Sequence, residues 1–131
     1  DFSATMARCP ERLLEVIQFL ASMPSQERIF GLMYEDLGDG LPEELGIWTR
    51  SVCRVMEACS WKDGQLLMHV HGQWNMKTAA TLACLANGAS GVWAGLSDQG
   101  AIIGHASSTI TAVNLLRLGN KSVLRRYNIK K

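Results

Sequence analysis

The sequence lacks the features that mark membrane-spanning, disordered and nucleic-acid-binding chains. No apolar run approaches the length of about 18 residues that a membrane-spanning helix requires. The formal net charge is only +1 at pH 7, which gives no indication of binding to nucleic acid or to a charged membrane surface. Apolar residues make up 47% of the 131 residues and charged residues 19%. This composition is typical of one folded domain with a sizeable core and excludes a disordered chain.

Cysteine is also too scarce to build a disulfide scaffold. The four cysteines are Cys9, Cys53, Cys59 and Cys84, and no two of them form a C-x-x-C pair. Their spacing does not suggest a zinc site. We therefore expect free thiols in a reducing compartment, either the cytoplasm or the matrix of a mitochondrion or plastid.

What the chain does have is an alternation of helical and strand patterns. Apolar residues at helical spacing predict amphipathic helices, and short apolar runs between them predict buried strands. Helices are expected at 10–23, from Pro42 onward, at 76–86 and at 107–118, and strands at 29–34, 66–70 and 91–96. This order predicts an α/β fold in which parallel strands are joined by helical crossovers. We expect one domain over 1–131, with a basic C-terminal tail at 120–131.

The sharpest chemical feature is His69-Val70-His71 at the end of the second predicted strand. Residues two apart in a strand point to the same face, so both imidazoles are expected to project together. The C-terminal end of the strands carries the active site in parallel barrels. Two neutral imidazoles are good ligands for a divalent metal. The alternative is a pair of hydrogen-bonded histidines at a hydrated strand end.

The neighbouring predicted strands supply further candidates at the same rim. His105 lies in the loop after the third strand, and Glu35 and Asp36 end the first. We expect His105 to join His69 and His71 as a metal ligand, and the two carboxylates to contact substrate or move a proton. The alternatives are a solvated acidic loop and a loop histidine that bonds the backbone.

The segment from His69 to Ala89 resembles the metal-dependent TIM-barrel lyases and synthases, the family that holds HMG-CoA lyase, isopropylmalate synthase and homocitrate synthase. In that family H-x-H-N/D precedes an alanine-rich helix that ends in Gly-Ala, and here His69-Val70-His71 precedes a helix that ends in Gly88-Ala89. The segment 35–42 fits the family pattern D-T-x-G-x-x-x-P, with Glu35 and Asp36 in place of Asp-Thr. The family histidines bind the metal, so the resemblance implies this role for His69 and His71.

Several positions depart from the family pattern. The family has Gly-Asn near the metal where this chain has Gly104-His105, and Gly72 replaces the Asn or Asp after the second histidine. Ser97-Asp98-Gln99 stands where the lyase has a reactive cysteine. The D-R-E motif of the family's first strand does not occur in the chain.

The resemblance covers 29–119 and implies the last three strands of a TIM barrel of eight. It implies a divalent-metal-dependent (Mg, Mn or Zn) carbon–carbon bond lyase or synthase of the aldol or Claisen type. The substrate would be a small-molecule carboxylate such as a 2-oxo acid, or a 3-hydroxyacyl-CoA-like thioester. The alternative is a non-catalytic barrel remnant that serves as an accessory subunit. The enzyme interpretation requires the missing strands.

Two further expectations concern the surroundings of the site. Trp74 lies in the loop directly after His71, and Ser107 and Ser108 follow His105, so these three residues are the candidate substrate-binding residues. A three-stranded partial barrel also leaves its inner face open, which strand alternation places at Leu32, Leu67 or Met68, and Val92 or Trp93. We therefore expect a partner that covers this face: the rest of the barrel, a second copy or another protein chain.

Overall fold

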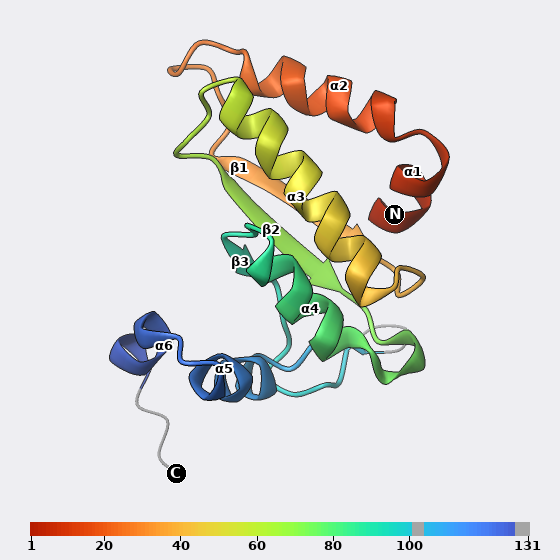
Figure 1. The fold of residues 1–131 in the computed structure, drawn as a ribbon, viewed down its shortest axis with the longest axis vertical. Coiled ribbons are helices and arrows are strands. Elements are labelled where there is room, and N and C mark those ends of the chain that lie inside the picture. The colour runs from red at the N-terminus through yellow and green to blue at the C-terminus, as the bar shows by residue number, and fades with distance from the viewer. Residues whose placement is uncertain (101–103, 128–131) are drawn as a thin grey trace.

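A computed structural model describes residues 1–100 and 104–127, and Figure 1 shows the arrangement of its elements. The strands are β1 (Gly31–Asp36), β2 (Gln65–Val70) and β3 (Gly91–Val92). The helices are α1 (Phe2–Arg8), α2 (Pro10–Ala21), α3 (Pro42–Ala58), α4 (Lys77–Ala86), α5 (Ser108–Arg117) and α6 (Lys121–Arg126), and a short 3-10 turn, η1, covers Gln73–Asn75.

The three strands form one parallel sheet in the order β1-β2-β3. Glu35 of β1 lies opposite His69 of β2, and Met68 of β2 lies opposite Val92 of β3. The α/β class and the parallel pairing are therefore confirmed, whereas the TIM-barrel assignment stays a prediction. Across residues 1–100 and 104–127, no helix has the length and apolar character needed to span a membrane.

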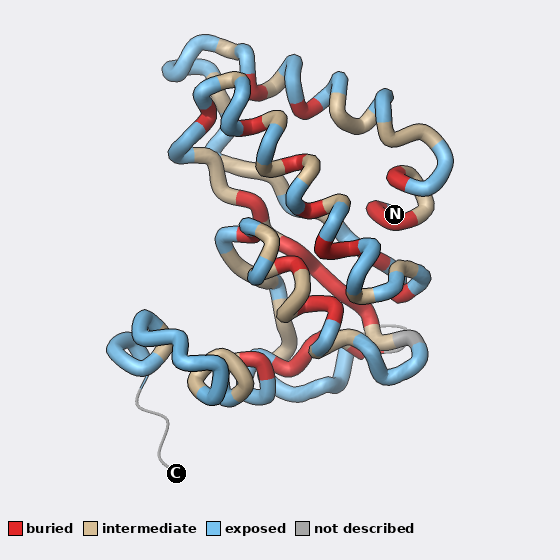
Figure 2. The backbone as a smooth tube through the Cα atoms, in the orientation of Figure 1, coloured by how far each residue is buried: buried red, intermediate tan, exposed pale blue. Residues whose placement is uncertain are grey.

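Helices α3 and α4 cover one face of the sheet (Figure 1). Every second residue of β2 faces them, and Leu66, Met68 and Val70 are each no more than 2% exposed. Figure 2 shows β2 as a buried segment behind these helices. Burial of such a side chain contributes about 1.5–3 kcal/mol relative to its exposure. This row of β2 is therefore the centre of the core.

The start of α3 is specified locally. Pro42 occupies the first turn, where its missing N–H leaves no intrahelical bond unmade. Glu43 and Glu44 place negative charge near the positive end of the helix dipole. The Glu44 carboxylate also accepts a hydrogen bond of 3.1 Å from the Leu41 N–H. The buried residues of α3 recur every three to four positions and pack on the sheet: Leu45, Thr49, Val52 and Met56.

The other face of the sheet has no helix over it among the described residues. Met33 is 51% exposed and Trp93 57% exposed on this side. Leu67 lies opposite Met33 in the strand register. The expectation that Leu32 lies on the open face is wrong, because Leu32 packs against the core and its neighbour Met33 takes the open position. Val92 pairs with Met68, so its side chain lies on the helix-covered face of the sheet. Trp93, the next residue, therefore lies on the open face.

Both ends of the chain contain helices that the apolar pattern did not predict. The first is α1, which is capped by the Asp1 side chain and buries Phe2 and Met6. Within the basic tail, the Asn120 side-chain oxygen accepts hydrogen bonds from the Ser122 and Val123 N–H groups and begins α6. Residues 128–131 of the expected tail lie outside the described residues. All four cysteines are free thiols.

Candidate metal centre

Three histidines from two separate segments lie together at the C-terminal end of β2. His69 is the last residue but one of β2, His71 follows the strand, and His105 lies before α5. The ring centroids are 4.7 Å apart for His69 and His71, 4.4 Å for His69 and His105, and 4.6 Å for His71 and His105. Each histidine offers one ring nitrogen, and these nitrogens lie within 4.8 Å of one another. The expected convergence is therefore observed, and the three histidines form a candidate metal-binding cluster.

The backbone brings His105 to this position. An isolated antiparallel bridge pairs His105 with His71, and the Ala106 N–H donates to the Val70 carbonyl at 3.2 Å. Gly104 precedes His105 with φ +81°, a conformation that favours glycine. A side chain at position 104 would also collide with the Asp98 carbonyl. Gly104 is therefore required for the turn that places His105 beside the other two rings.

Glu35 of β1 is the acidic residue at the cluster. Its Oε1 lies 2.8 Å from His71 Nε2 and 3.8 Å from His69 Nε2. The ionised Glu35 carboxylate only accepts, so His71 donates its Nε2–H to it, and in a neutral imidazole the lone pair then lies on Nδ1. That Nδ1 is buried and has no hydrogen-bond partner among the described residues. A buried ring nitrogen with a free lone pair is what a metal ligand requires.

The carbonyl of Trp93 orients His69 in the same way. His69 Nδ1 lies 3.1 Å from the Trp93 oxygen, so Nδ1–H donates to the carbonyl and Nε2 keeps its lone pair. Both strand-end histidines thus bond an acceptor through one nitrogen and leave the other for a ligand. Histidines that ligate a metal characteristically donate their second N–H to a carboxylate or a backbone carbonyl. The donor set therefore fits a divalent metal.

The ionisation of the site also suits metal binding. The hydrogen bond from His71 lowers the pKa of Glu35 from its ordinary value of 4.5. Burial lowers the pKa of His105 from 6.5, and the neighbouring His69 and His71 lower it further. Near neutral pH the cluster therefore holds an ionised Glu35 and a neutral His105. Neutral imidazole is the form that binds a metal.

Asp36 does not reach the histidines, although the sequence paired it with Glu35. It is fully buried, and its carboxylate accepts hydrogen bonds from the Ser3 hydroxyl and, at 3.0 Å, from the Gly38 N–H. Both residues belong to β1, where neighbours alternate between the two faces of the sheet. Asp36 therefore ties α1 to the helix-covered face, and Glu35 alone of the pair lies at the candidate metal centre.

The three candidate substrate-binding residues lie in different settings. Trp74 is 85% exposed and has a left-handed backbone with φ +56°. Ser107 is buried, and its hydroxyl caps α5 by accepting from the Ile110 N–H at 3.2 Å. Ser108 is exposed and lines a cavity that excludes the histidines. Their role in substrate binding stays a prediction.

Two contributions to the site were missed in the sequence. The Trp93 carbonyl is a backbone group, which no pattern of side chains reveals. Lys77 begins α4, and its Nζ donates to the Asp98 carbonyl at 3.2 Å and lies 3.9 Å from the Asp98 carboxylate. It thus holds Asp98 near the start of α4. The sequence signal was the position of Lys77 in the first turn of its helix, where the helix dipole disfavours a positive charge.

Comparisons with protein-family models and with curated proteins found no match. The function is therefore inferred from the geometry of the three histidines and from the family resemblance of the sequence.

Proposed function

We propose that this chain carries the metal centre of a divalent-metal-dependent carbon–carbon bond lyase or synthase. The observation that supports the proposal best is the set of three histidine nitrogens within 4.8 Å of one another. The resemblance of 29–119 to the metal-dependent barrel enzymes supplies the reaction class. The expected substrates are 2-oxo acids and 3-hydroxyacyl thioesters.

The donor set favours zinc among the expected metals. Imidazole nitrogen suits zinc, whereas magnesium and manganese prefer carboxylate and other oxygen ligands. Three protein ligands leave a coordination position open, as catalytic zinc sites do. A divalent metal held there supplies a Lewis acid that polarises a carbonyl or hydroxyl oxygen of the substrate.

Glu35 supports this chemistry by orienting His71. Its lowered pKa keeps it ionised near neutral pH, so it accepts hydrogen bonds and is a poor proton donor. Its side chain is 51% exposed, so its outer face is accessible to a bound substrate. We therefore assign Glu35 to positioning of His71 and to substrate contact rather than to protonation.

The competing function is that of a non-catalytic accessory subunit. The open face of the sheet supports it, because the exposed Met33 and Trp93 form part of a surface that a partner chain would cover. In that case the histidines would bind a metal for structural purposes or none at all.

Calorimetric titration of the whole chain with zinc and with manganese tests the metal centre. We expect one zinc ion per chain and loss of binding in His105→Ala, which removes a partly exposed ring. Asp39→Asn, an exposed change in the loop after β1, is the matched control. Absence of zinc binding at micromolar concentration would overturn the proposal.

The reaction class is tested with the zinc-loaded chain and a 3-hydroxyacyl thioester or a 2-oxo acid with acetyl thioester. Zinc-dependent formation of the cleaved or condensed product, lost in His105→Ala, supports the lyase or synthase function. Zinc binding without turnover of either substrate would favour the accessory function.

A further inference from the structure

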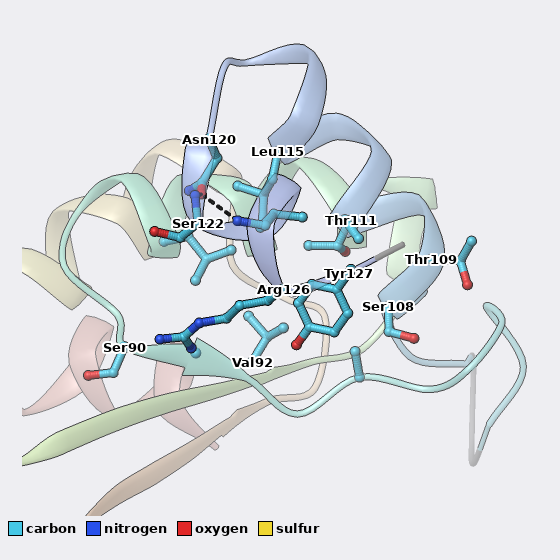
Figure 3. Close-up of a pocket in the computed structure, with 15 residues that line it drawn as sticks. Ser90, Val92, Ser108, Thr109, Thr111, Leu115, Asn120, Ser122, Arg126 and Tyr127 are labelled. Atoms are coloured by element: carbon cyan, nitrogen blue, oxygen red, sulfur yellow. Dashed lines mark hydrogen bonds between the residues drawn. The ribbon is translucent and has the colours of Figure 1, made fainter. Parts of the chain in front are cut away.

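A cavity separate from the histidine cluster lies among β3, α4, α5 and α6 (Figure 3). Its volume is about 580 Å³, within the range of about 300–1,000 Å³ that holds small organic ligands. None of the three histidines nor Glu35 lines it. It is therefore independent of the proposed metal centre.

The charge of the cavity comes from one residue. Arg126 of α6 lines it, and no described lining residue is Asp or Glu. In the part of the chain that the structure describes, Arg126 has no carboxylate within ion-pair distance. Figure 3 shows its side chain extending past Val92 in the direction of Ser90, with the Tyr127 ring beside it. A guanidinium with this freedom favours an anion, above all a planar carboxylate.

Thr111 of α5 gives the second, independent indication of a ligand. It is 3% exposed and lines the same cavity. Its Oγ1 is buried and has no hydrogen-bond partner among the described residues. A buried hydroxyl without a partner is unfavourable, so rotation of the Thr111 side chain toward a polar ligand group in the cavity would be favoured.

The remaining wall is largely apolar. Val92 and Ala94 come from the strand side, and Leu85 and Leu115 from α4 and α5. Short polar side chains also line it, from Ser90, Ser108, Thr109, Asn120 and Ser122. An apolar wall with placed polar groups is the usual composition of a small-molecule site. The ligand that fits this lining has an apolar body and one negative group.

We propose that this cavity binds an amphipathic carboxylate, with its apolar part against Val92 and Leu115 and its carboxylate at Arg126. The hydroxyl of Thr111 bonds a polar atom of the ligand. The site is a binding site and takes no part in the reaction at the histidines.

Octanoate is the probe, titrated into the whole chain and followed by amide chemical shifts in nuclear magnetic resonance spectra. We expect shifts at β3, α5 and α6, and an affinity about tenfold weaker in Arg126→Gln, the loss of one charge-assisted hydrogen bond. Arg125→Gln is the matched control: it removes the same charge from the same helix at a residue outside the cavity lining. That variant should retain the affinity of the parent.

A second variant separates ligand binding from a structural role. Thr111→Val keeps the side-chain volume and removes the hydroxyl, so it should weaken octanoate binding severalfold without lowering the thermal midpoint. A structural role would lower that midpoint instead. Octanol, the neutral analogue, should bind the parent more weakly than octanoate does. The two compounds should bind Arg126→Gln with equal affinity. Equal octanoate affinity in the parent and in Arg126→Gln, or shifts confined to the open sheet face, would overturn the proposal.

Discussion

Glu35 and Asp36 are adjacent carboxylates with opposite surroundings. Glu35 accepts a hydrogen bond from His71 at 2.8 Å and is exposed at the sheet rim. Asp36 is fully buried and bonds Ser3 and Gly38 on the other face. Strand alternation places their side chains on opposite faces of the sheet, so substitutions of the two residues should affect different properties of the chain.

The first prediction compares Glu35→Gln with Asp36→Asn. Glu35→Gln should weaken zinc binding about 10–100-fold, because a carboxylate that orients a ligating histidine contributes that much to affinity. Its thermal stability should change little. Asp36→Asn should lower thermal stability and leave zinc affinity unchanged. Calorimetric titration and thermal unfolding check the pair, and a loss of zinc affinity in Asp36→Asn would contradict the division of roles.

The second prediction concerns the stability of the metal-free chain in acid. Since the pKa of His105 is lowered in the fold, the unfolded chain binds its proton more readily. The free energy of unfolding should therefore fall as the pH decreases below about 6.5, the ordinary value of histidine. The pKa of Glu35 is also lowered, so its contribution is present above 4.5 and is lost as the pH falls through its value in the fold.

Thermal unfolding between pH 8 and pH 5.5 measures the His105 contribution. The midpoint should decrease on acidification, and the decrease should be smaller in His105→Gln, which has no proton to gain. An equal decrease in the two proteins would assign the pH dependence to other groups.

For individual residues, the sequence predicted the position of the three histidines better than the burial of their surroundings. Spacing of two residues placed His69 and His71 on one face, and the parallel order of the strands placed His105 beside them. It did not predict that His71 is only 2% exposed, because burial depends on segments distant in the chain. His71→Ala should therefore cost more stability than a surface substitution or than His105→Ala, which removes a proposed ligand that is only partly buried.

Among the elements, β2 determines which face of the sheet is the core. Its residues Leu66, Met68 and Val70 pack under α3 and α4, and the opposite row consists of Gln65, Leu67 and His69. The third prediction uses two methionines of the sheet on opposite faces. Met68→Ala should lower the free energy of unfolding by about 2–5 kcal/mol, because it leaves a cavity in the core. In the dissociated chain, at high dilution, Met33→Ala should change it by about 0.5 kcal/mol or less, as expected for a surface position.

Urea unfolding of the two variants checks this prediction, with the parent chain as reference. A cost for Met33→Ala equal to that of Met68→Ala in the dissociated chain would contradict the assignment of Met33 to the open face of the sheet.

The lengths of the elements show the limit of local patterns. The run 91–96 is apolar and predicted a strand of that length, yet only Gly91–Val92 pairs with β2. The Trp93 N–H still donates to the Met68 carbonyl of β2. The strand ends there because the Trp93 carbonyl accepts from the ring Nδ1–H of His69 instead of from a backbone N–H of β2. At the ends of the chain, α1 and α6 depend on side-chain caps at Asp1 and Asn120 rather than on apolar periodicity.

For the whole molecule, the alternation of helices and strands was sufficient to predict a parallel sheet in an α/β fold. The alternation does not determine whether the sheet continues into a barrel, because closure depends on strands beyond the three observed. The order β1-β2-β3 leaves β1 and β3 as edge strands within the described structure. Unpaired edge groups and an uncovered face both favour association with another chain.

The last prediction is that the isolated chain does not remain a monomer. Its open face carries the exposed Met33 and Trp93, and β1 presents unpaired N–H and C=O groups at the edge. Exposed apolar surface of this kind is normally covered in soluble proteins. Sedimentation at low micromolar concentration should therefore show species heavier than the 14.4 kDa chain.

A charged substitution on the open face tests the cause of this association. Met33→Glu should reduce the heavier species, because it places a charge in the surface to be buried. Ile47→Glu is the matched control, since Ile47 is similarly exposed but belongs to α3 on the opposite side of the sheet. If the parent sediments as a monomer with a cooperative thermal transition, the open face needs no partner, and the partial-barrel interpretation loses its main structural support.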